Sequence, residues 1–343
     1  MKRSVLAGIV ALAVVASGCA SSASRSRGSA DTIRLGVFPN LTHAPGLVAI
    51  QGGIFDKDLS PAKVEVHPFN SGSDASAALL SGSLDATYIG PGPTLSMWVK
   101  SDKVAVVSGV TSGGASFVVR KGVSISSAQD LHGKKVAVPG IGNTQDVALR
   151  TWLEDRGLKA KDDGGDVAIV PVDNPELPQV FRSGDVDAAW EPEPWPSLLE
   201  SQGLATRFID EATLWPDGKF VTTLLVVSKG YLDAHPEVVK KLVQANFDAI
   251  EQIESDPDGA KADARSELVT LGASTLPEDV LDSAWNKLEF SWDPLVSALR
   301  TNARNAFATK AIEEDPGDLA GLVQLNYLNS VLASAGKPKV RAA

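Results

Sequence analysis

Short apolar segments alternate with amphipathic ones along the first two thirds of the chain. Continuous apolar runs, such as residues 32–38, 84–90 and 104–110, are typical of buried strands. Between them lie segments with a helical period that end at glycines, such as 47–55 and 74–82. This alternation predicts βαβ units in an α/β fold, with mostly parallel sheets and right-handed crossovers.

The same plan repeats further along. Strands are predicted at 115–122, 134–139, 166–172 and 186–192, with helices at 144–156 and 177–184. An apolar strand at 220–228 precedes a helical tail, with helices predicted at 234–253, 257–271, 277–288 and 319–334. Roughly 310 residues exceed what one core usually supports, so two lobes are expected. We assign 32–112 and 221–343 to lobe one and 113–220 to lobe two, which gives a hinge of two crossing strands.

One phrase occurs in both predicted lobes. Ser-Gly-x-x-Asp-Ala begins at Ser81 and again at Ser183, 102 positions later, and a proline-rich turn follows each copy. The period is too long, and the copies too few, for a solenoid. In each copy a helix is predicted to end at the glycine and a strand to begin at the aspartate. Open α/β sheets bind ligands beyond the carboxyl ends of their strands, so the two turns are expected to line one cleft.

The N-terminus has the parts of a secretory signal. Lys2 and Arg3 precede an apolar run at 5–16 that is too short to span a bilayer, and small residues precede Cys19. Ala-Ser-Gly-Cys resembles a lipobox, with Ala16 in the place usually held by Leu. We therefore expect residues 1–19 to be a lipoprotein signal, Cys19 to be lipidated, and the serine-rich stretch 20–31 to be a flexible tether. Ordinary cleavage near Ala20 is the alternative.

Composition excludes several classes of function. The formal net charge is −10 and no basic cluster occurs, which argues against a nucleic-acid partner. Cys19 is the single cysteine, so no intrachain disulfide, thiolate metal site or cysteine nucleophile is available. The four histidines lack metal-ligand spacing. No catalytic residue, metal or cofactor is predicted.

Two loops at predicted strand ends carry candidate ligand groups. PGIGNTQD (139–146) is a glycine-rich turn into a helix, where free N–H groups and the helix dipole favour an anion. It lacks the lysine of a nucleotide-binding P-loop. PNLTHAPG (39–46) offers Asn40, Thr42 and His43.

Aromatic and acidic residues flank the second copy of the phrase. Trp190 and Trp195 suggest an aromatic wall of a small-molecule pocket. Glu191 and Glu193 would repel an anion, so either the ligand has a donor or cationic part, or these carboxylates serve another partner.

Several segments resemble the substrate-binding lipoproteins of nitrate-, sulfonate- and taurine-type ABC importers. They are LGVFPNLTHAPGLVAIQGGIF, LLSGSLDATYIGPGPT, GNTQDVALRTWL, DAAWEPEPW and WPDGKFVTTLLVV, and the resemblance runs from Ile33 to Ser334. It implies a type II periplasmic-binding-protein fold that closes on its ligand and delivers it to an ABC permease. It also implies an exported, lipid-anchored monomer. Gly142, Asn143 and Thr144 stand where sulfonate binders have a serine-rich turn, and Trp190, Glu191 and Pro192 where they have Trp-Asp-Pro.

The expected ligand is a small organic anion, most simply an aliphatic sulfonate or taurine. Nitrate and a thiamine-type pyrimidine are alternatives. A pyrimidine-synthase-like enzyme is a further one, but such enzymes resemble this family with a cysteine-rich iron-binding motif that this chain lacks. A sulfonate would take hydrogen bonds from Asn143 and Thr144, and Trp190 and Ile89 would cover its alkyl tail. A pyrimidine would instead stack on Trp190 and give its amino group to Glu191. The expected ligand-binding residues are Asn40, Thr42, His43, Ser73, Ile89, Gly90, Pro91, Gly114, Gly142, Asn143, Thr144, Trp190, Glu191 and Glu193.

Overall fold

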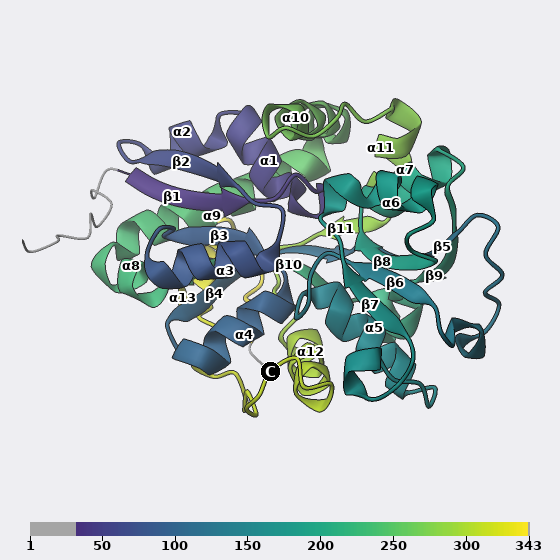
Figure 1. Cartoon of the computed structure of the whole chain (residues 1–343). Helices are drawn as coiled ribbons and strands as arrows, with labels where there is room; N and C mark the ends of the chain where they lie inside the picture. The colour runs from purple at the N-terminus through teal and green to yellow at the C-terminus, as the bar shows by residue number, and fades with distance from the viewer. Residues whose placement is uncertain (1–31, 342–343) are drawn as a thin grey trace, which may run out of the picture.

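The computed structural model describes residues 32–341, which form two sheets side by side, each covered by helices (Figure 1). The signal, the tether and Cys19 lie outside the described residues. Sheet one has the order β11-β4-β10-β3-β1-β2, and sheet two has the order β7-β6-β8-β5-β9. We call sheet one with its helices lobe one, and sheet two with its helices lobe two.

The strands of sheet one are β1 (Thr32–Val37), β2 (Lys63–Pro68), β3 (Ala86–Ile89), β4 (Val104–Gly113), β10 (Val221–Ser228) and β11 (Leu288–Phe290). Those of sheet two are β5 (Ala115–Arg120), β6 (Lys135–Val138), β7 (Ala168–Pro171), β8 (Ala188–Pro192) and β9 (Ala205–Asp210). The strands of the βαβ units are parallel, as predicted, but β10 in sheet one and β5 in sheet two run antiparallel to their neighbours. Both are crossing strands, which enter their sheet from the other lobe and so arrive in the opposite direction.

Helices cover both faces of each sheet. On one face of sheet one lie α1 (Ala44–Gln51), α2 (Ile54–Leu59), α9 (Pro236–Ser255), α10 (Pro257–Thr270) and α13 (Asn326–Ser334), with α8 (Lys229–Ala234) before α9. The other face carries α3 (Gly72–Ser81), α4 (Pro91–Ser101) and α12 (Val296–Ala308). Sheet two packs α5 (Thr144–Glu154) on one face and α6 (Leu177–Ser183) and α7 (Trp195–Ser201) on the other.

The tail contacts both lobes. α12 packs on α4 of lobe one and on α5 of lobe two, and α11 (Glu278–Trp285) packs on α7 (Figure 1). The expectation that the tail packs on lobe one was therefore incomplete. The helix predicted over 319–334 begins only at Asn326 in the structure, because 319–325 holds a left-handed Leu319 and a bridge from Val323 to β4. Among the described residues, no helix combines the length and apolarity needed to cross a bilayer.

The first crossing is a single residue, whereas the second spans residues 211–220. β4 ends at Gly113 and β5 begins at Ala115, while β9 ends at Asp210 and β10 begins at Val221. Gly113 and Gly114 both have positive φ, and a Cβ at Gly114 would lie 2.1 Å from the Leu288 side chain. Glycine is therefore required where the first crossing turns between the sheets.

Candidate functional site

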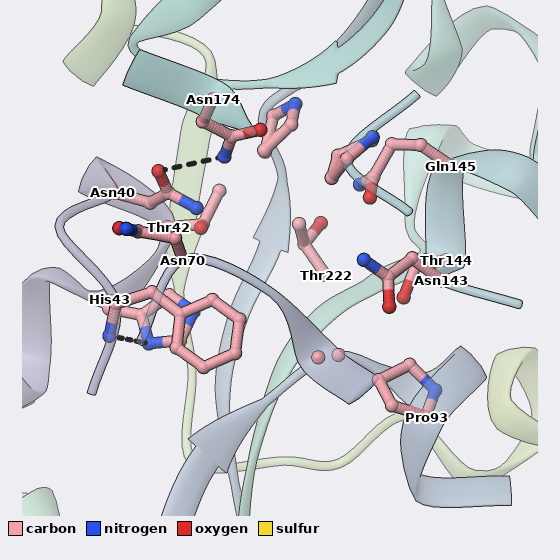
Figure 2. A pocket seen from close by; sticks show the side chains of 15 residues that line it. Asn40, Thr42, His43, Asn70, Pro93, Asn143, Thr144, Gln145, Asn174 and Thr222 are labelled. Atoms are coloured by element: carbon pink, nitrogen blue, oxygen red, sulfur yellow. Dashed lines mark hydrogen bonds between the residues drawn. The ribbon is translucent and has the colours of Figure 1, made fainter. Parts of the chain in front are cut away.

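A small cavity lies between the lobes at the carboxyl ends of the parallel strands (Figure 2). Corresponding loops of the two lobes supply its walls: β1–α1 and β6–α5, β2–α3 and β7–α6, β3–α4 and β8–α7. Its volume is about 40 Å³. The lining residues are Phe38, Asn40, Thr42, His43, Asn70, Gly72, Gly90, Pro93, Pro139, Asn143, Thr144, Gln145, Asn174, Pro192 and Thr222. This set contains no Lys, Arg, Asp or Glu.

The N-terminus of α5 forms one wall. Asn143 is its N-cap, and the N–H groups of Thr144 and Gln145 begin the helix, where no earlier carbonyl of the helix can accept them. Asp146 in the first turn accepts the Gly142 N–H at 2.7 Å, and Arg150 holds Asp146 at 2.8 Å. These contacts hold the loop in place on the side away from the cavity. The N–H groups of Thr144 and Gln145, at the start of the helix, are left to point at the cavity.

The N-terminus of α4 faces α5 across the cleft. Pro91 and Pro93 have no N–H, and the Gly92 N–H donates to Thr144 Oγ1 at 3.3 Å. A Cβ at Gly90 would lie 2.4 Å from Thr144 Oγ1, and a Cβ at Gly92 would lie 2.8 Å from the Gly142 carbonyl oxygen. This helix start therefore serves as a close contact surface for lobe two rather than as a source of free donors.

The β1–α1 loop supplies neutral polar groups. His43 is buried and stacks on Phe38 with ring centroids 4.8 Å apart. Burial lowers the pKa of His43 to about 3, so its imidazole is neutral. Its Nδ1 accepts the Phe38 N–H at 3.3 Å, which leaves the proton on Nε2.

Asn40 joins the two lobes at the cavity. Its Oδ1 accepts hydrogen bonds from Asn174 Nδ2 at 3.2 Å and from Trp195 Nε1 at 2.8 Å, and both donors belong to lobe two. Figure 2 shows the Asn40–Asn174 contact, with Asn143, Thr144 and Gln145 opposite and Thr222 between the two sides. The cavity is thus closed by hydrogen bonds between protein atoms of both lobes.

Six of the residues expected from the sequence line this cavity: Asn40, Thr42, His43, Gly90, Asn143 and Thr144. Ser73 and Gly142 line an adjoining groove between α3, α4 and the β6–α5 loop. Pro91 starts α4, Ile89 lies in the apolar core of lobe one and Gly114 lies at the crossing, so none of these side chains is among the lining residues.

Trp190, which was expected to face the ligand, does not line this cavity. Its side chain is fully buried in the core of lobe two against Phe117 and Trp152, and its Nε1 donates to Glu211 at 2.7 Å. Successive residues of a strand point to opposite faces, so Trp190 faces α5, whereas Glu191 faces α6 and α7. Glu191 does not line the cavity, but its Oε2 lies 3.1 Å from the amide of Asn174, which does.

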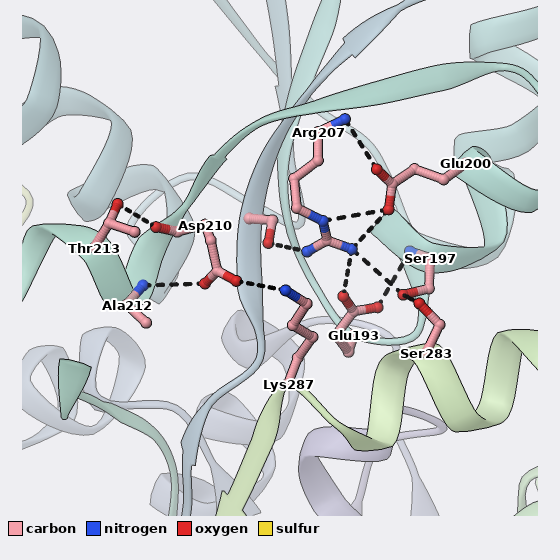
Figure 3. A network of polar contacts seen from close by, with 10 residues as sticks. Glu193, Ser197, Glu200, Arg207, Asp210, Ala212, Thr213, Ser283 and Lys287 are labelled. Carbon is pink, nitrogen blue, oxygen red and sulfur yellow. Dashed lines mark hydrogen bonds and ion pairs between the residues drawn. The ribbon is translucent and has the colours of Figure 1, made fainter.

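Glu193 serves another protein group. Its carboxylate accepts from Arg207 Nη2 at 2.9 Å and from the Ser197 N–H at 3.2 Å (Figure 3). Arg207 also binds Glu200 and Ser116. Burial raises the pKa of Glu193, and Arg207 opposes that shift. Of the two interpretations of this carboxylate left open by the sequence, the structure supports a partner within the protein.

Four polar lining residues were missed: Asn70, Gln145, Asn174 and Thr222. Asn174 follows β7 as Asn40 follows β1. The expectation that ligands bind beyond the carboxyl ends of parallel strands would therefore have identified Asn174 as well. Thr222 lies on the returning crossing strand, where no motif marks it. In the part of the chain that the structure describes, no three His, Cys, Asp or Glu side chains gather as a metal site would require.

The model of the NMT1-like family matches residues 27–271. The chain belongs to the NMT1-like family. Among curated relatives, the taurine-binding periplasmic protein of Escherichia coli strain K12 is 29% identical over 232 residues, covering 67% of this chain and 69% of that protein. A putative binding protein of Brucella abortus strain 2308 is 30% identical over 204 residues, covering 57% of this chain and 58% of that protein.

Solved structures show how the NMT1-like chain is built. It resembles the alkanesulfonate-binding protein SsuA from Xanthomonas axonopodis pv. citri, with a TM-score of 0.72, 20% identity and coverage of 83% and 95% of the two chains. It also resembles the nitrate-binding protein NrtA from Synechocystis PCC 6803, with a TM-score of 0.77, 17% identity and coverage of 90% of each chain. The expected periplasmic-binding-protein fold and the resemblance to importer binding proteins are confirmed. These relatives are binding proteins rather than enzymes, and this chain is a periplasmic-type binding protein.

Proposed function

We propose that this chain is the extracytoplasmic receptor of an ABC importer for a small sulfonate, either taurine or a short alkanesulfonate. The observation that carries the proposal is the composition of the cavity wall, which consists of neutral donors at helix starts with no acidic side chain among them. The taurine-binding relative and the alkanesulfonate-binding neighbour support the same ligand class.

Charge favours an anion even though no cation lines the cavity. The positive end of the α5 dipole, the Thr144 and Gln145 N–H groups and the Asn143 side chain converge on one side. Helix starts bind anions in this way, because free N–H groups and the dipole act together. Neutral His43 adds a donor at Nε2 and no charge that would have to be desolvated.

Size favours a short ligand. A buried water needs roughly 10–15 Å³, so about 40 Å³ holds about three waters, and a sulfonate of six or seven heavy atoms fits only if the lobes close less far around it. The predicted cover for an alkyl tail, Trp190 and Ile89, is absent from the wall. Phe38, Pro93, Pro139 and Pro192 are the apolar groups present, and they would contact one or two methylenes.

Nitrate is the second candidate. The same donors would bind it, and a planar ion of four heavy atoms needs no apolar cover. A pyrimidine is less well supported, because Trp190 offers it no face and Glu191 lies behind Asn174.

The remaining parts of the proposal concern attachment and partners. The signal at 1–19 would direct export, and lipidated Cys19 with the tether at 20–31 would hold the receptor at the outer face of the cytoplasmic membrane. A monomer is expected to pass its ligand to the cognate permease.

Isothermal titration calorimetry of the purified chain with taurine, ethanesulfonate, nitrate and a thiamine-type pyrimidine tests the ligand. We expect one of the sulfonates to bind most tightly and, at a hundredfold excess over its dissociation constant, to stabilise the fold by about 2.7 kcal/mol. Asn143→Ala should weaken that binding at least tenfold, whereas the exposed Asn286→Ala, the matched control, should leave it unchanged. Binding of the pyrimidine alone would exclude the proposal.

A further inference from the structure

The groove that adjoins the ligand cavity is the larger of the two spaces. Its volume is about 270 Å³, against about 40 Å³ for the cavity. Small-molecule sites usually enclose about 300–1,000 Å³, so the groove offers the space that the cavity lacks. Asn143 and Pro93 line both spaces, and they therefore form the wall between them.

That wall is made by both lobes. Pro93 belongs to α4 of lobe one, whereas Asn143 precedes α5 of lobe two. Gly72 of α3 lies against both, since a Cβ there would lie 2.6 Å from Asn143 Oδ1 and 2.7 Å from Pro93 Cγ. The Asn143 side chain makes no capping hydrogen bond to its helix. A movement of the lobes that enlarges the cavity also separates Asn143 from Pro93, and so joins the cavity to the groove.

Two helix faces form the floor of the groove. α4 contributes Pro93, Ser96, Met97 and Lys100, which have the i, i+3, i+4, i+7 spacing of one helix face. α3 contributes four residues with the same spacing, from Ser73 to Leu80. Both helices begin at the carboxyl ends of their strands, at the cleft. The groove therefore leads away from the cavity along them, over two helical turns or about 10 Å.

The other wall of the groove comes from lobe two. Ile141 of the β6–α5 loop lines it and is 53% exposed, more than any other large apolar side chain among the described residues. Ile141 and Met97 thus offer apolar contacts to a ligand that lies in the groove. A chain of methylenes is the simplest group that would use them.

The polar groups of the groove suit an anion. Lys100 forms no ion pair with another described residue. Ser76 Oγ is buried and has no hydrogen-bond partner among the described residues. None of the described residues that line the groove is acidic, although the chain has a net charge of −10. Because a helical side chain leans toward the start of its helix, the Lys100 ammonium is directed back along the groove toward the cavity.

We propose that the groove is a second subsite of the ligand site and takes the tail of a sulfonate that ends in another acidic group. The sulfonate head binds at the start of α5, and the methylene chain passes Asn143 and lies against Met97 and Ile141. The terminal carboxylate then accepts hydrogen bonds from Lys100 and Ser76. The inference rests on the proposed function, which supplies the site for the head. It adds sulfonates with a second acid to the short ones that need only the cavity.

The experiment compares 4-sulfobutanoate with butanesulfonate by calorimetry on the purified chain. The two ligands have the same number of carbons and differ in the carboxylate. We expect the wild type to bind 4-sulfobutanoate about two- to fivefold more tightly, which is the gain from one partly exposed ion pair. Lys100→Met should abolish that gain. Lys103→Met is the matched control, because it changes the net charge equally at an exposed lysine that does not line the groove, and it should leave the gain intact.

A second variant fills the groove itself. Ala77 lines the groove from α3 and is exposed, so Ala77→Phe should leave the thermal unfolding midpoint close to that of the wild type. It should weaken both four-carbon ligands about tenfold relative to ethanesulfonate, because their outer methylenes lose the groove.

Three results would overturn the inference while ethanesulfonate binding still supports the proposed function. They are equal affinities of the wild type for the two four-carbon ligands, equal effects of Lys100→Met and Lys103→Met, and no effect of Ala77→Phe on the four-carbon ligands. If no sulfonate binds at all, the proposed function fails, and the inference fails with it.

Discussion

The two copies of the Ser-Gly-x-x-Asp-Ala phrase begin alike and then diverge. Gly82 and Gly184 end their helices with the same left-handed backbone, φ 78° in each. Asp85 then accepts the Arg34 N–H of β1 at 2.9 Å, and Asp187 accepts the Lys135 N–H of β6 at 3.0 Å. The repeated residues therefore perform one structural task, which is to attach a strand to its neighbour, and the ligand is left to the loops that follow.

Those loops differ in chemistry. Lobe one continues with Ile89 and Pro91, where lobe two has Glu191 and Glu193, both fully buried. An apolar, tightly packed turn in one lobe thus corresponds to buried acids in the other. The difference shows that the repeated residues serve the scaffold, whereas the acids that follow in lobe two contact groups of lobe two itself, Glu193 with Arg207 and Glu191 with the amide of Asn174.

The largest loss of stability is expected when Arg207 of lobe two is removed. We found no counterpart of the ion pairs that it makes with Glu193 and Glu200 among the described residues of lobe one. Arg207→Met leaves Glu193 buried without its cation and should cost about 3–5 kcal/mol in the free energy of unfolding at pH 7. Urea denaturation measures this loss. The loss should shrink at pH 4, where Glu193 can take up a proton, and the double variant with Glu193→Leu should recover most of it. A single variant as stable as wild type would mean that the network is dispensable.

The second prediction concerns ligand affinity and the tight turn at the start of α4 in lobe one. Gly92→Ala places a methyl group against the backbone of the β6–α5 loop and should cost about 1–3 kcal/mol of lobe closure, which lowers ligand affinity roughly 5- to 150-fold. Calorimetry measures the affinity. Gly230→Ala is the matched control, since its Cβ meets open space in α8. Unchanged affinity in Gly92→Ala would show that the lobes close less tightly than the structure indicates.

The smallest expected effect is the difference in stability lost when each of the two repeated aspartates is replaced. Asp85 is bound bidentately by Arg34 and is nearly buried, whereas Asp187 is more exposed and lies 3.4 Å from Arg120. Asp85→Asn should cost about 1.5–3 kcal/mol, and Asp187→Asn about 1 kcal/mol or less. Thermal unfolding of the two variants side by side measures the difference. Equal losses would mean that the shared backbone contact, rather than the ion pair, carries the stability.

The sequence predicted the alternating elements well, because each βαβ unit has a clear apolar period and a glycine at its helix end. It missed α12, whose buried face includes Asn302 and two alanines, and the edge strand β9, most of whose residues are only half-buried. At the site, the loops after β1 and β6 were found from their position at strand ends. Trp190 was predicted to face the ligand because the prediction did not consider that successive side chains along β8 point to opposite faces of the sheet. The Gly142 N–H was expected to be free, and only the structure shows that Asp146 takes it.

The hydrogen bonds of Asn40 have a consequence for how affinity is set. Its Oδ1 accepts from two donors of lobe two, and Leu41 N–H donates to the Glu193 carbonyl oxygen at 3.2 Å, so part of the free energy of closing comes from the protein itself. The apparent dissociation constant equals the intrinsic one divided by the fraction of molecules already closed. A substitution at Trp195, whose side chain does not line the cavity, therefore changes the affinity by changing that fraction, and evolution can adjust the receptor to scarce or abundant ligand without altering what it recognises.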